Sequence, residues 1–469
     1  MSASPWPATR ALAERIARTA AEEIDPASLG RAREAVTDTV GVTLAGASEP
    51  CARIARRLAR EEGAAPRASV IGTGERTSPT WAALLNGTAG HALDFDDVDH
   101  VILGHPSVTM TPALIALAEE RGLGGRALLA AYAVGFETLH ALGRAVIPQH
   151  YRRGFHATAT LGAVGTAAAC AHLIGLGAVR TRHALSLSAS GAAGLTINFG
   201  TMTKPFHAGQ AARAGLLAAR LAEAGFTAAE DALETGFTSA LAAEGIGPGV
   251  EGFADWEGAV GQWGPPWDIA EGVCVKIHPC CAMTHTGIDA MLELCRREGI
   301  RAEEVEGIEA RVSPMAMRIL RYPVATTGLE GKFSMPFCLA SAVVDGRVGL
   351  PQFEDDRVGR PEVAALQEGA IFEVDPELAE KDPESHTAEV GVRLRDGRRL
   401  RAREERARGD VDLPLSHEEL REKFVECAEV RLTPEGAAAA WDAWWSLEAA
   451  ETLDAPLALL CPADGGEAD

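Results

Sequence analysis

The chain has 469 residues, 47% of them hydrophobic and 5% aromatic, which is enough for two or three domains with a large core. Its 44 basic and 66 acidic side chains give a formal net charge of −22. Because such a charge repels polyanions, we expect no nucleic-acid partner and no membrane partner.

The sequence shows neither a signal peptide nor a run of eighteen apolar residues, and both observations favour a soluble, cytoplasmic protein. Its nine cysteines are odd in number and lack the spacing of a disulfide framework, so we expect reduced thiols. Cys280 and Cys281 are adjacent, and no Cys-x-x-Cys occurs. The pattern therefore predicts no structural zinc site.

A helical pattern covers roughly the first 265 residues. Asp25-Pro26 opens a predicted helix that runs to Leu44, because apolar residues recur there every three or four positions. Further helices are predicted over residues 112–121, 125–146, 158–175, 181–193 and 209–224. They are rich in Ala and Gly on several faces, which is typical of helices that pack closely in a multi-helix core.

The pattern changes after Trp267. Residues 305–312 and 389–395 alternate at or near period two, and Asp396-Gly397 then turns the chain into a third strand over 398–401. Helices are predicted over 286–297 and 335–344. We infer a smaller α+β domain over residues 268–402.

Two helical signals follow this segment. Ser416-His-Glu-Glu419 predicts a capped helix to Val430, and Thr433-Pro-Glu starts a last helix that carries three tryptophans. We therefore expect a mainly α protein. Its large helical domain is predicted to come from residues 1–267 and 403–460, with the α+β unit inserted between them and a disordered tail over 461–469.

Lysine is rare in this chain, with five residues against 39 arginines. Two lysines lie beside His and Pro: Lys204 in Thr201-Met-Thr-Lys-Pro-Phe-His207 and Lys276 in Lys276-Ile-His-Pro-Cys-Cys281. A chain that uses arginine for general surface charge should keep lysine where a compact ammonium group is needed. Both lysines are therefore site candidates, although they could also be surface lysines that escaped a drift toward arginine.

An acidic stretch is the next candidate. Asp94, Asp96 and Asp97 repel one another unless they meet cations, donors or a helix N-terminus. The alternatives are a solvated loop with a cap, or a metal site, for which this segment offers few oxygen ligands. His105-Pro106 follows at a predicted junction between loop and helix, where functional residues are common.

Two further residues stand out. His156 enters an Ala/Gly-rich helix, where it could cap the helix or act as an acid or base near neutral pH. Tyr322 is one of only three tyrosines and lies between Arg321 and Pro323. It could serve the site or simply pack at a turn.

These segments resemble the MmgE/PrpD family, which includes 2-methylcitrate dehydratase, cis-aconitate decarboxylase and iminodisuccinate epimerase. The resemblance runs from about residue 5 to 450. It rests on an ordered set of motifs: His91-Ala-Leu-Asp-Phe-Asp-Asp97, Gly104-His-Pro-Ser107, Gly154-Phe-His156, Thr201-Met-Thr-Lys-Pro-Phe-His207, Lys276-Ile-His-Pro-Cys-Cys281 and Lys332-Phe-Ser-Met-Pro336.

The resemblance implies a large all-α domain from both chain ends, an inserted α+β lid and a homodimer. It also implies site roles for Asp94, His105, His156, Lys204, Lys276 and Tyr322. The sequence departs from the family pattern in two ways. Val98 follows the acidic stretch at the position where decarboxylase-like members are expected to have Thr, and the segment from there to His105 is one residue longer. Val98 removes a hydroxyl group beside the reaction centre.

The chemistry that fits is proton transfer at a carbon next to a carboxylate, without a cofactor or a metal. Lys204 and Lys276 would bind the carboxylates of a small di- or tricarboxylic acid and stabilise the charge that develops in the transition state. His105 and His156 would move the proton. Asp94 would orient an imidazole, and Tyr322 would donate to a carboxylate or assist a leaving hydroxyl.

We expect a hydro-lyase that resembles 2-methylcitrate dehydratase. Decarboxylation of an aconitate-like acid and epimerisation of an amino- or imino-dicarboxylate are the alternatives, because all three reactions pass through a similar intermediate. A catalytically silent helical dimer is the non-enzyme alternative, but it has no evident use for so many titratable groups in one pocket.

Overall fold

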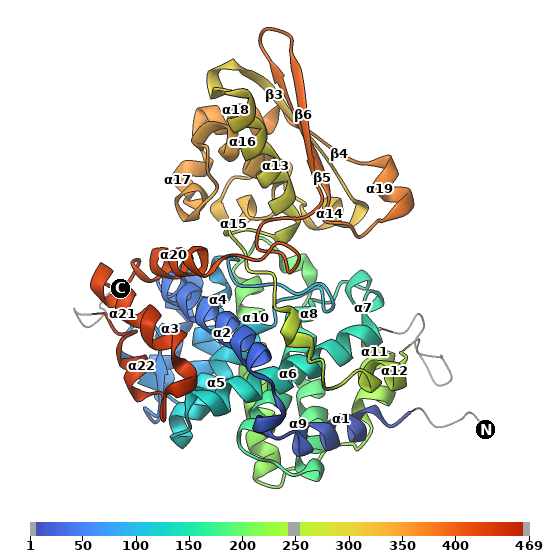
Figure 1. Ribbon diagram of the computed structural model, residues 1–469, viewed down its shortest axis with the longest axis vertical. Helices are drawn as coiled ribbons and strands as arrows, with labels where there is room; N and C mark the ends of the chain where they lie inside the picture. The colour runs from blue at the N-terminus through green and yellow to red at the C-terminus, as the bar shows by residue number, and fades with distance from the viewer. Residues whose placement is uncertain (1–5, 243–253, 463–469) are drawn as a thin grey trace.

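The computed structural model describes residues 6–242 and 254–462. Figure 1 shows two bodies along the long axis, a larger one of packed helices and a smaller one in which helices lie beside a sheet. The chain is mainly α, which confirms the predicted fold class. Within the described ranges, no helix has both the length and the apolar character needed to cross a bilayer. Most of the predicted disordered tail, residues 463–469, lies outside the described residues.

The first part of the chain supplies these helices of the larger body: α1 (Ala8–Arg18), α2 (Pro26–Gly46), α3 (Pro50–Glu62), α4 (Pro79–Ala92), α5 (Ser107–Arg121), α6 (Gly125–Val146), α7 (Gln149–Arg152), α8 (Ala157–Leu173), α9 (Ala178–Gly191), α10 (Thr203–Glu223), α11 (Thr238–Leu241) and α12 (Trp256–Gly261). The helix predicted over residues 125–146 has the predicted bounds. Asp25 caps α2 as predicted, since its carboxylate accepts hydrogen bonds from the backbone of Ala27 and Ser28.

Several helices begin earlier than predicted, and the difference is largest for α10 and α5. The helix expected from residue 209 starts at Thr203, because Pro205 lies in the first turn, where backbone amides have no partner inside the helix. The helix expected from Pro112 starts at Ser107 and contains this proline. Its buried packing outweighs the lost hydrogen bond. The short ribbon of β1 (Ala68–Val70) and β2 (Glu75–Thr77) was not predicted.

Glycines bring α4 and α10 into backbone contact. A Cβ atom added to Gly87 would lie 2.8 Å from the Cα of Gly209, and one added to Gly209 would lie 2.2 Å from the carbonyl oxygen of Leu84. No larger residue fits at either position without moving a backbone. This contact sets the end of α4 beside the start of α10, and the candidate site is built there.

The smaller body contains a four-stranded sheet in the order β4-β3-β5-β6 (Figure 1). Its strands are β3 (Val305–Val312), β4 (Ile371–Val374), β5 (Ala388–Leu394) and β6 (Arg399–Glu404). The β3–β4 pair is parallel and the other pairs are antiparallel. The predicted hairpin turn is present, with Gly397 at a φ of 92°. Strand β4 was missed because it is a short, partly exposed edge strand.

The helices of this body are α13 (Ala282–Glu298), α14 (Pro314–Ile319), α15 (Gly328–Gly331), α16 (Met335–Asp345), α17 (Asp355–Val358), α18 (Pro361–Glu368) and α19 (Pro376–Lys381). The helices predicted over 286–297 and 335–344 correspond to α13 and α16. Gly287 on α13 packs tightly against the side chain of Met335 on α16, where an added Cβ atom would lie 2.6 Å from the sulfur.

The chain then returns to the helical body through α20 (His417–Ala428), α21 (Pro434–Trp445) and α22 (Asp454–Ala458). Ser416 and Glu419 form the predicted capping box. Lys423 on α20 donates to Asp38 on α2 across 2.9 Å. The C-terminal helices therefore pack on the N-terminal ones, while the domain boundaries at 267/268 and 402/403 stay predictions.

Candidate active site

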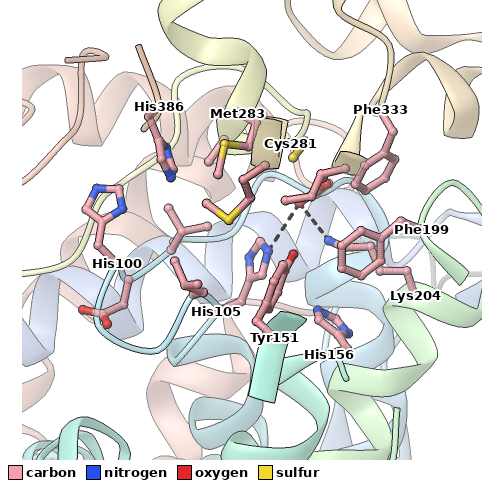
Figure 2. A pocket seen from close by; sticks show the side chains of 18 residues that line it. His100, His105, Tyr151, His156, Phe199, Lys204, Cys281, Met283, Phe333 and His386 are labelled. Carbon is pink, nitrogen blue, oxygen red and sulfur yellow. Dashed lines mark ion pairs between the residues drawn. The ribbon is translucent and has the colours of Figure 1, made fainter. Parts of the chain in front are cut away.

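A cavity lies between the two bodies and encloses about 550 Å³, including its opening to solvent. Figure 2 shows the side chains that line it. The helical body contributes Asp94, His100, His105, Tyr151, His156, Phe199 and Lys204, and the other body contributes Cys281, Met283, Met315, Ile319, Phe333 and His386.

Asp94 is the centre of the polar end of this cavity. It follows α4 with a φ of 51°, in the left-handed region that Asp occupies more readily than most residues. Its Oδ1 accepts from Lys276 Nζ at 2.6 Å and lies 3.1 Å from Lys204 Nζ. Burial opposes ionisation, but the two ammonium groups hold the pKa of Asp94 well below its usual range.

Two more lysines bond to the same turn. Lys332 donates to the carbonyl of Leu93 at 2.8 Å, and Lys423 donates to that of Phe95 at 2.9 Å. Four of the five lysines in the chain therefore bond to three consecutive residues, and all four are buried. The rare lysines of this chain therefore hold the turn that carries Asp94.

Lys204 lies in the first turn of α10 and is buried. Its Nζ is 5.4 Å from the ring centroids of both Phe199 and Phe333, and 2.9 Å from His91 Nε2. Burial lowers the pKa of Lys204, with Asp94 opposing and Lys276 adding to the shift. The pKa of Lys276 is raised, because Asp94 and Asp96 outweigh its burial. Lys276 is thus a fixed charge, whereas Lys204 gives up its proton more readily.

His91 is a residue that the sequence analysis did not single out, although it opens one of the quoted motifs. Its Nδ1 lies 2.8 Å from the carboxylate of Asp96, so Nδ1 carries the proton and Nε2 accepts from Lys204. Burial lowers the pKa of His91 despite Asp96. The two hydrogen bonds that join Asp96 to His91 and His91 to Lys204 therefore fix the position of the Lys204 ammonium.

His105 and His156 both reach the cavity (Figure 2). Nδ1 of His105 lies 3.1 Å from Asp96, and Nε2 lies 3.7 Å from Asp94. Asp96 rather than Asp94 is thus the closer carboxylate to an imidazole. Burial lowers the pKa of His105 to about 3 despite Asp96. Burial and Lys204 together hold the pKa of His156 well below its usual value. Both imidazoles are therefore neutral near pH 7.

His156 does not act as a helix cap, since its side chain makes no capping hydrogen bond to α8. Its Nδ1 lies instead 3.1 Å from Nδ1 of His207, on α10. The acidic stretch is not a solvated loop either, because Asp94, Asp96 and Asp97 are at most 3% exposed. Asp97 turns away from the cavity and bonds to Ser107 at the start of α5.

The structure brings together five of the six predicted site residues and sets Tyr322 apart. Its hydroxyl donates to the carbonyl of Phe199 at 3.1 Å, and its ring packs on Gly200, whose φ is 85°. Neither Tyr322 nor Lys276 is among the residues that line the cavity, but Lys276 bonds directly to Asp94, which does line it. Tyr322 supports the segment that precedes Lys204, and its predicted contact with a substrate stays a prediction.

The cavity walls also contain residues that the sequence did not indicate. Tyr151 precedes the Gly154-Phe-His156 motif, and burial raises its pKa. His100 and His386 lie at the end away from Lys204 (Figure 2), and Val98 also lines the cavity. His100 and His386 are 286 positions apart in sequence, yet their ring centroids lie 4.7 Å apart. No local pattern predicts such a pairing.

His91, Asp94, Asp96 and His105 offer ligand atoms within 4.8 Å of one another, as a metal site would. However, Lys204 and Lys276 already place two ammonium groups on Asp94 and His91. A divalent cation there would face both charges at close range. These lysines make the cluster a poor metal site.

Comparison with known proteins identifies two family matches. The MmgE/PrpD N-terminal domain matches residues 10–245, and the MmgE/PrpD C-terminal domain matches residues 278–449. A cis-aconitate decarboxylase from Homo sapiens is 29% identical over 411 residues, covering 84% of this chain and 82% of the relative. A cis-aconitate decarboxylase from Aspergillus terreus is 27% identical over 426 residues, covering 86% of each chain.

Proposed function

Because the chain belongs to the MmgE/PrpD family, we propose that it is a cofactor-independent lyase of small di- or tricarboxylic acids. The observation that carries the proposal is the buried group of the Lys204 ammonium and two neutral imidazoles at one end of a cavity, where Asp94 also binds the Lys276 ammonium. Such a set suits proton transfer at a carbon next to a carboxylate. Relatives named cis-aconitate decarboxylase support the substrate class.

Lys204 and Lys276 are the proposed carboxylate-binding groups. A protein with a net charge of −22 needs local positive charge to bind an anion. Two ammonium groups face the single carboxylate of Asp94, so a substrate carboxylate can share them. When the proton leaves the substrate, negative charge spreads into that carboxylate. The same ammonium groups then bind the transition state more tightly than the ground state.

Dehydration is the reaction that the protonation states favour. A neutral imidazole can accept a proton, and both His105 and His156 are neutral near pH 7. One of them takes the proton from carbon, the C–O bond of the hydroxy acid breaks, and the hydroxyl leaves as water with a proton from an acid. Lys204 fits the acid role because its pKa is lowered toward the working range.

Decarboxylation of an aconitate-like acid is the second candidate, and the names of the relatives favour it. In that reaction the carboxyl group leaves as CO₂, and an acid delivers a proton to the carbanion that remains. Val98 lines the cavity at the position where decarboxylase-like members are expected to have Thr. Without this hydroxyl group, we place dehydration first. Epimerisation at an acidic carbon shares the initial proton abstraction.

A homodimer completes the proposal. Apolar side chains are exposed near the start of α10, where Ile197 is 69% exposed and Met202 and Phe206 are each 42% exposed. A second copy of the chain would cover them. Sedimentation of the purified protein tests this point, and a monomer at all concentrations would contradict it.

Proton NMR of the purified protein with citrate, methylcitrate, aconitate and aspartate-derived acids tests the reaction. We expect loss of water from a hydroxy acid. Loss of CO₂ would assign the second candidate, and change of configuration without net loss would assign an epimerase. No reaction with any of these acids would favour the silent helical dimer. The rate should survive EDTA, and a loss restored by Mg²⁺, Fe²⁺ or Zn²⁺ would contradict a metal-free mechanism.

A further inference from the structure

A second group of metal-ligating side chains lies where the chain crosses between the two bodies. It consists of His100, Cys274 and Asp410, from three stretches far apart in sequence. Their ligand atoms all lie within 4.8 Å of one another. All three residues line one small hollow, which shares Val98, His100, Ala282 and His386 with the main cavity. The proposed mechanism uses none of the three.

The backbone holds these stretches in place without help from the side chains. Cys274 and Val98 exchange two backbone hydrogen bonds, of 2.9 and 3.0 Å, which fix Cys274 beside the loop that carries His100. Val275 donates to the carbonyl of Gly409 at 2.8 Å, which fixes the neighbour of Asp410. Cys274 is a buried free thiol. The cluster is therefore preorganised, as ligands of a binding site must be.

The three ligand atoms converge on one point rather than forming a chain. Nε2 of His100 lies 2.9 Å from Oδ2 of Asp410 and 3.3 Å from Sγ of Cys274. In a Cys-His-Asp catalytic triad, the thiol and the carboxylate would face opposite ring nitrogens. Here both face the same nitrogen, and a single proton on Nε2 cannot serve both. A cation placed among the three would satisfy sulfur, nitrogen and oxygen together.

We infer that His100, Cys274 and Asp410 form a binding site for a divalent transition metal of zinc type. Zinc takes thiolate, imidazole and carboxylate ligands in this combination. Ligand atoms about 2.0 to 2.3 Å from one zinc ion lie roughly 3.5 Å apart. The two distances from His100 Nε2 are 2.9 and 3.3 Å, so small shifts would admit the ion. Three protein ligands leave a fourth position for water, and the hollow provides room for it.

The location gives the metal a role. Cys274 precedes α13, where the chain enters the smaller body, Asp410 lies between β6 and α20, where the chain leaves it, and His100 lies between α4 and α5 of the helical body. An ion bound by all three ties both crossings to the loop that carries His100. It stabilises the junction between the bodies, and it occupies the cavity end opposite Lys204.

Titration of the purified full-length protein with Co²⁺, after EDTA treatment and under reducing conditions, tests the site. We expect one equivalent to bind per chain, with a thiolate-to-cobalt charge-transfer band that Zn²⁺ abolishes. Cys274→Ser should lose this band. Asp410→Asn should weaken binding by about 10-fold or more, the loss seen even for residues that only support ligands. Cys281→Ala, which removes a neighbouring cavity thiol, should keep the band.

Absence of the band in the wild-type protein would overturn the inference, and so would a band that persists in Cys274→Ser. Zn²⁺ should also raise the thermal unfolding midpoint of the wild-type protein but not that of Cys274→Ser. This test is independent of the proposed reaction. Turnover without cobalt binding would sink only the metal site, and cobalt binding without turnover would sink only the proposed lyase activity.

Discussion

Lys204 Nζ lies 2.9 Å from Nε2 of His91, and the opposite nitrogen of the same ring is bound to Asp96. The buried ammonium is thus held by a neutral imidazole on one side and by Asp94 on the other. This arrangement keeps Lys204 charged enough to bind an anion, yet with a lowered pKa. It makes Lys204 the most informative residue to change.

Lys204→Met keeps the length and apolar stem of the side chain and deletes its charge. We expect KM to rise and kcat to fall together, because the ammonium would hold a carboxylate in both the ground state and the transition state. The loss of kcat should be about 10²-fold or more. Steady-state kinetics measures both. Lys381→Met is the matched control, since Lys381 is exposed on α19, where it pairs with Glu377.

His156→Gln preserves size and some hydrogen bonding but cannot titrate. We expect kcat to fall by about 10²-fold or more while the substrate still binds. Calorimetric binding of the substrate, together with turnover, separates the two effects. His172→Gln is the control, because His172 bonds to a backbone carbonyl outside the cavity. Near-normal turnover by a folded His156→Gln protein would show that His156 is structural.

Acid should destabilise the protein through His105. Its pKa in the folded protein is about 3, below the value of 6.5 for an unperturbed histidine, so the unfolded chain binds more protons. The stability from neutral His105 is complete above pH 6.5 and is lost as the pH falls toward 3. The slope for one proton is about 1.4 kcal/mol per pH unit. Urea unfolding from pH 7 to 4 should show a shallower decline for His105→Gln, and an unchanged slope would contradict the assignment.

Gly209→Ala should disturb the contact between α4 and α10. The new methyl group would meet the backbone of Leu84, and forcing the helices apart would cost about 1 to 3 kcal/mol. It would also move Lys204 away from His91, so kcat should fall. Gly30→Ala on α2 is the control, because a Cβ atom added to Gly30 would have no neighbouring atom within 4 Å. Denaturant melts should show Gly30→Ala as stable as wild type or more so.

The sequence predicted the elements whose signals are local. The cap at Asp25, the hairpin at Gly397 and the full extent of α6 follow from adjacent residues or from helical periodicity. Two helix starts were predicted too late because proline was expected to stand outside or at the start of each helix. Pro205 instead lies in the first turn of α10, and Pro112 lies inside α5, which is stabilised by burial.

The candidate site was predicted as a set of residues but not as an arrangement. The scarcity of lysine pointed to Lys204 and Lys276, and each of these lysines has a specific buried partner in the structure. The sequence could not show that Asp96, rather than Asp94, binds the imidazoles while Asp94 binds the lysines. This arrangement depends on the left-handed turn at Asp94, which aims one carboxylate at the lysines and the other at the imidazoles.

Reaction in D₂O tests the central claim most directly, namely that buried lysine and histidine groups transfer a proton at a carbon next to a carboxylate. The wild-type protein should place deuterium at that carbon, in recovered hydroxy acid or in product, and His156→Gln should do so much more slowly. Proton and deuterium NMR of the recovered acids measures this exchange. Turnover by the wild-type protein without deuterium at that carbon would contradict the account.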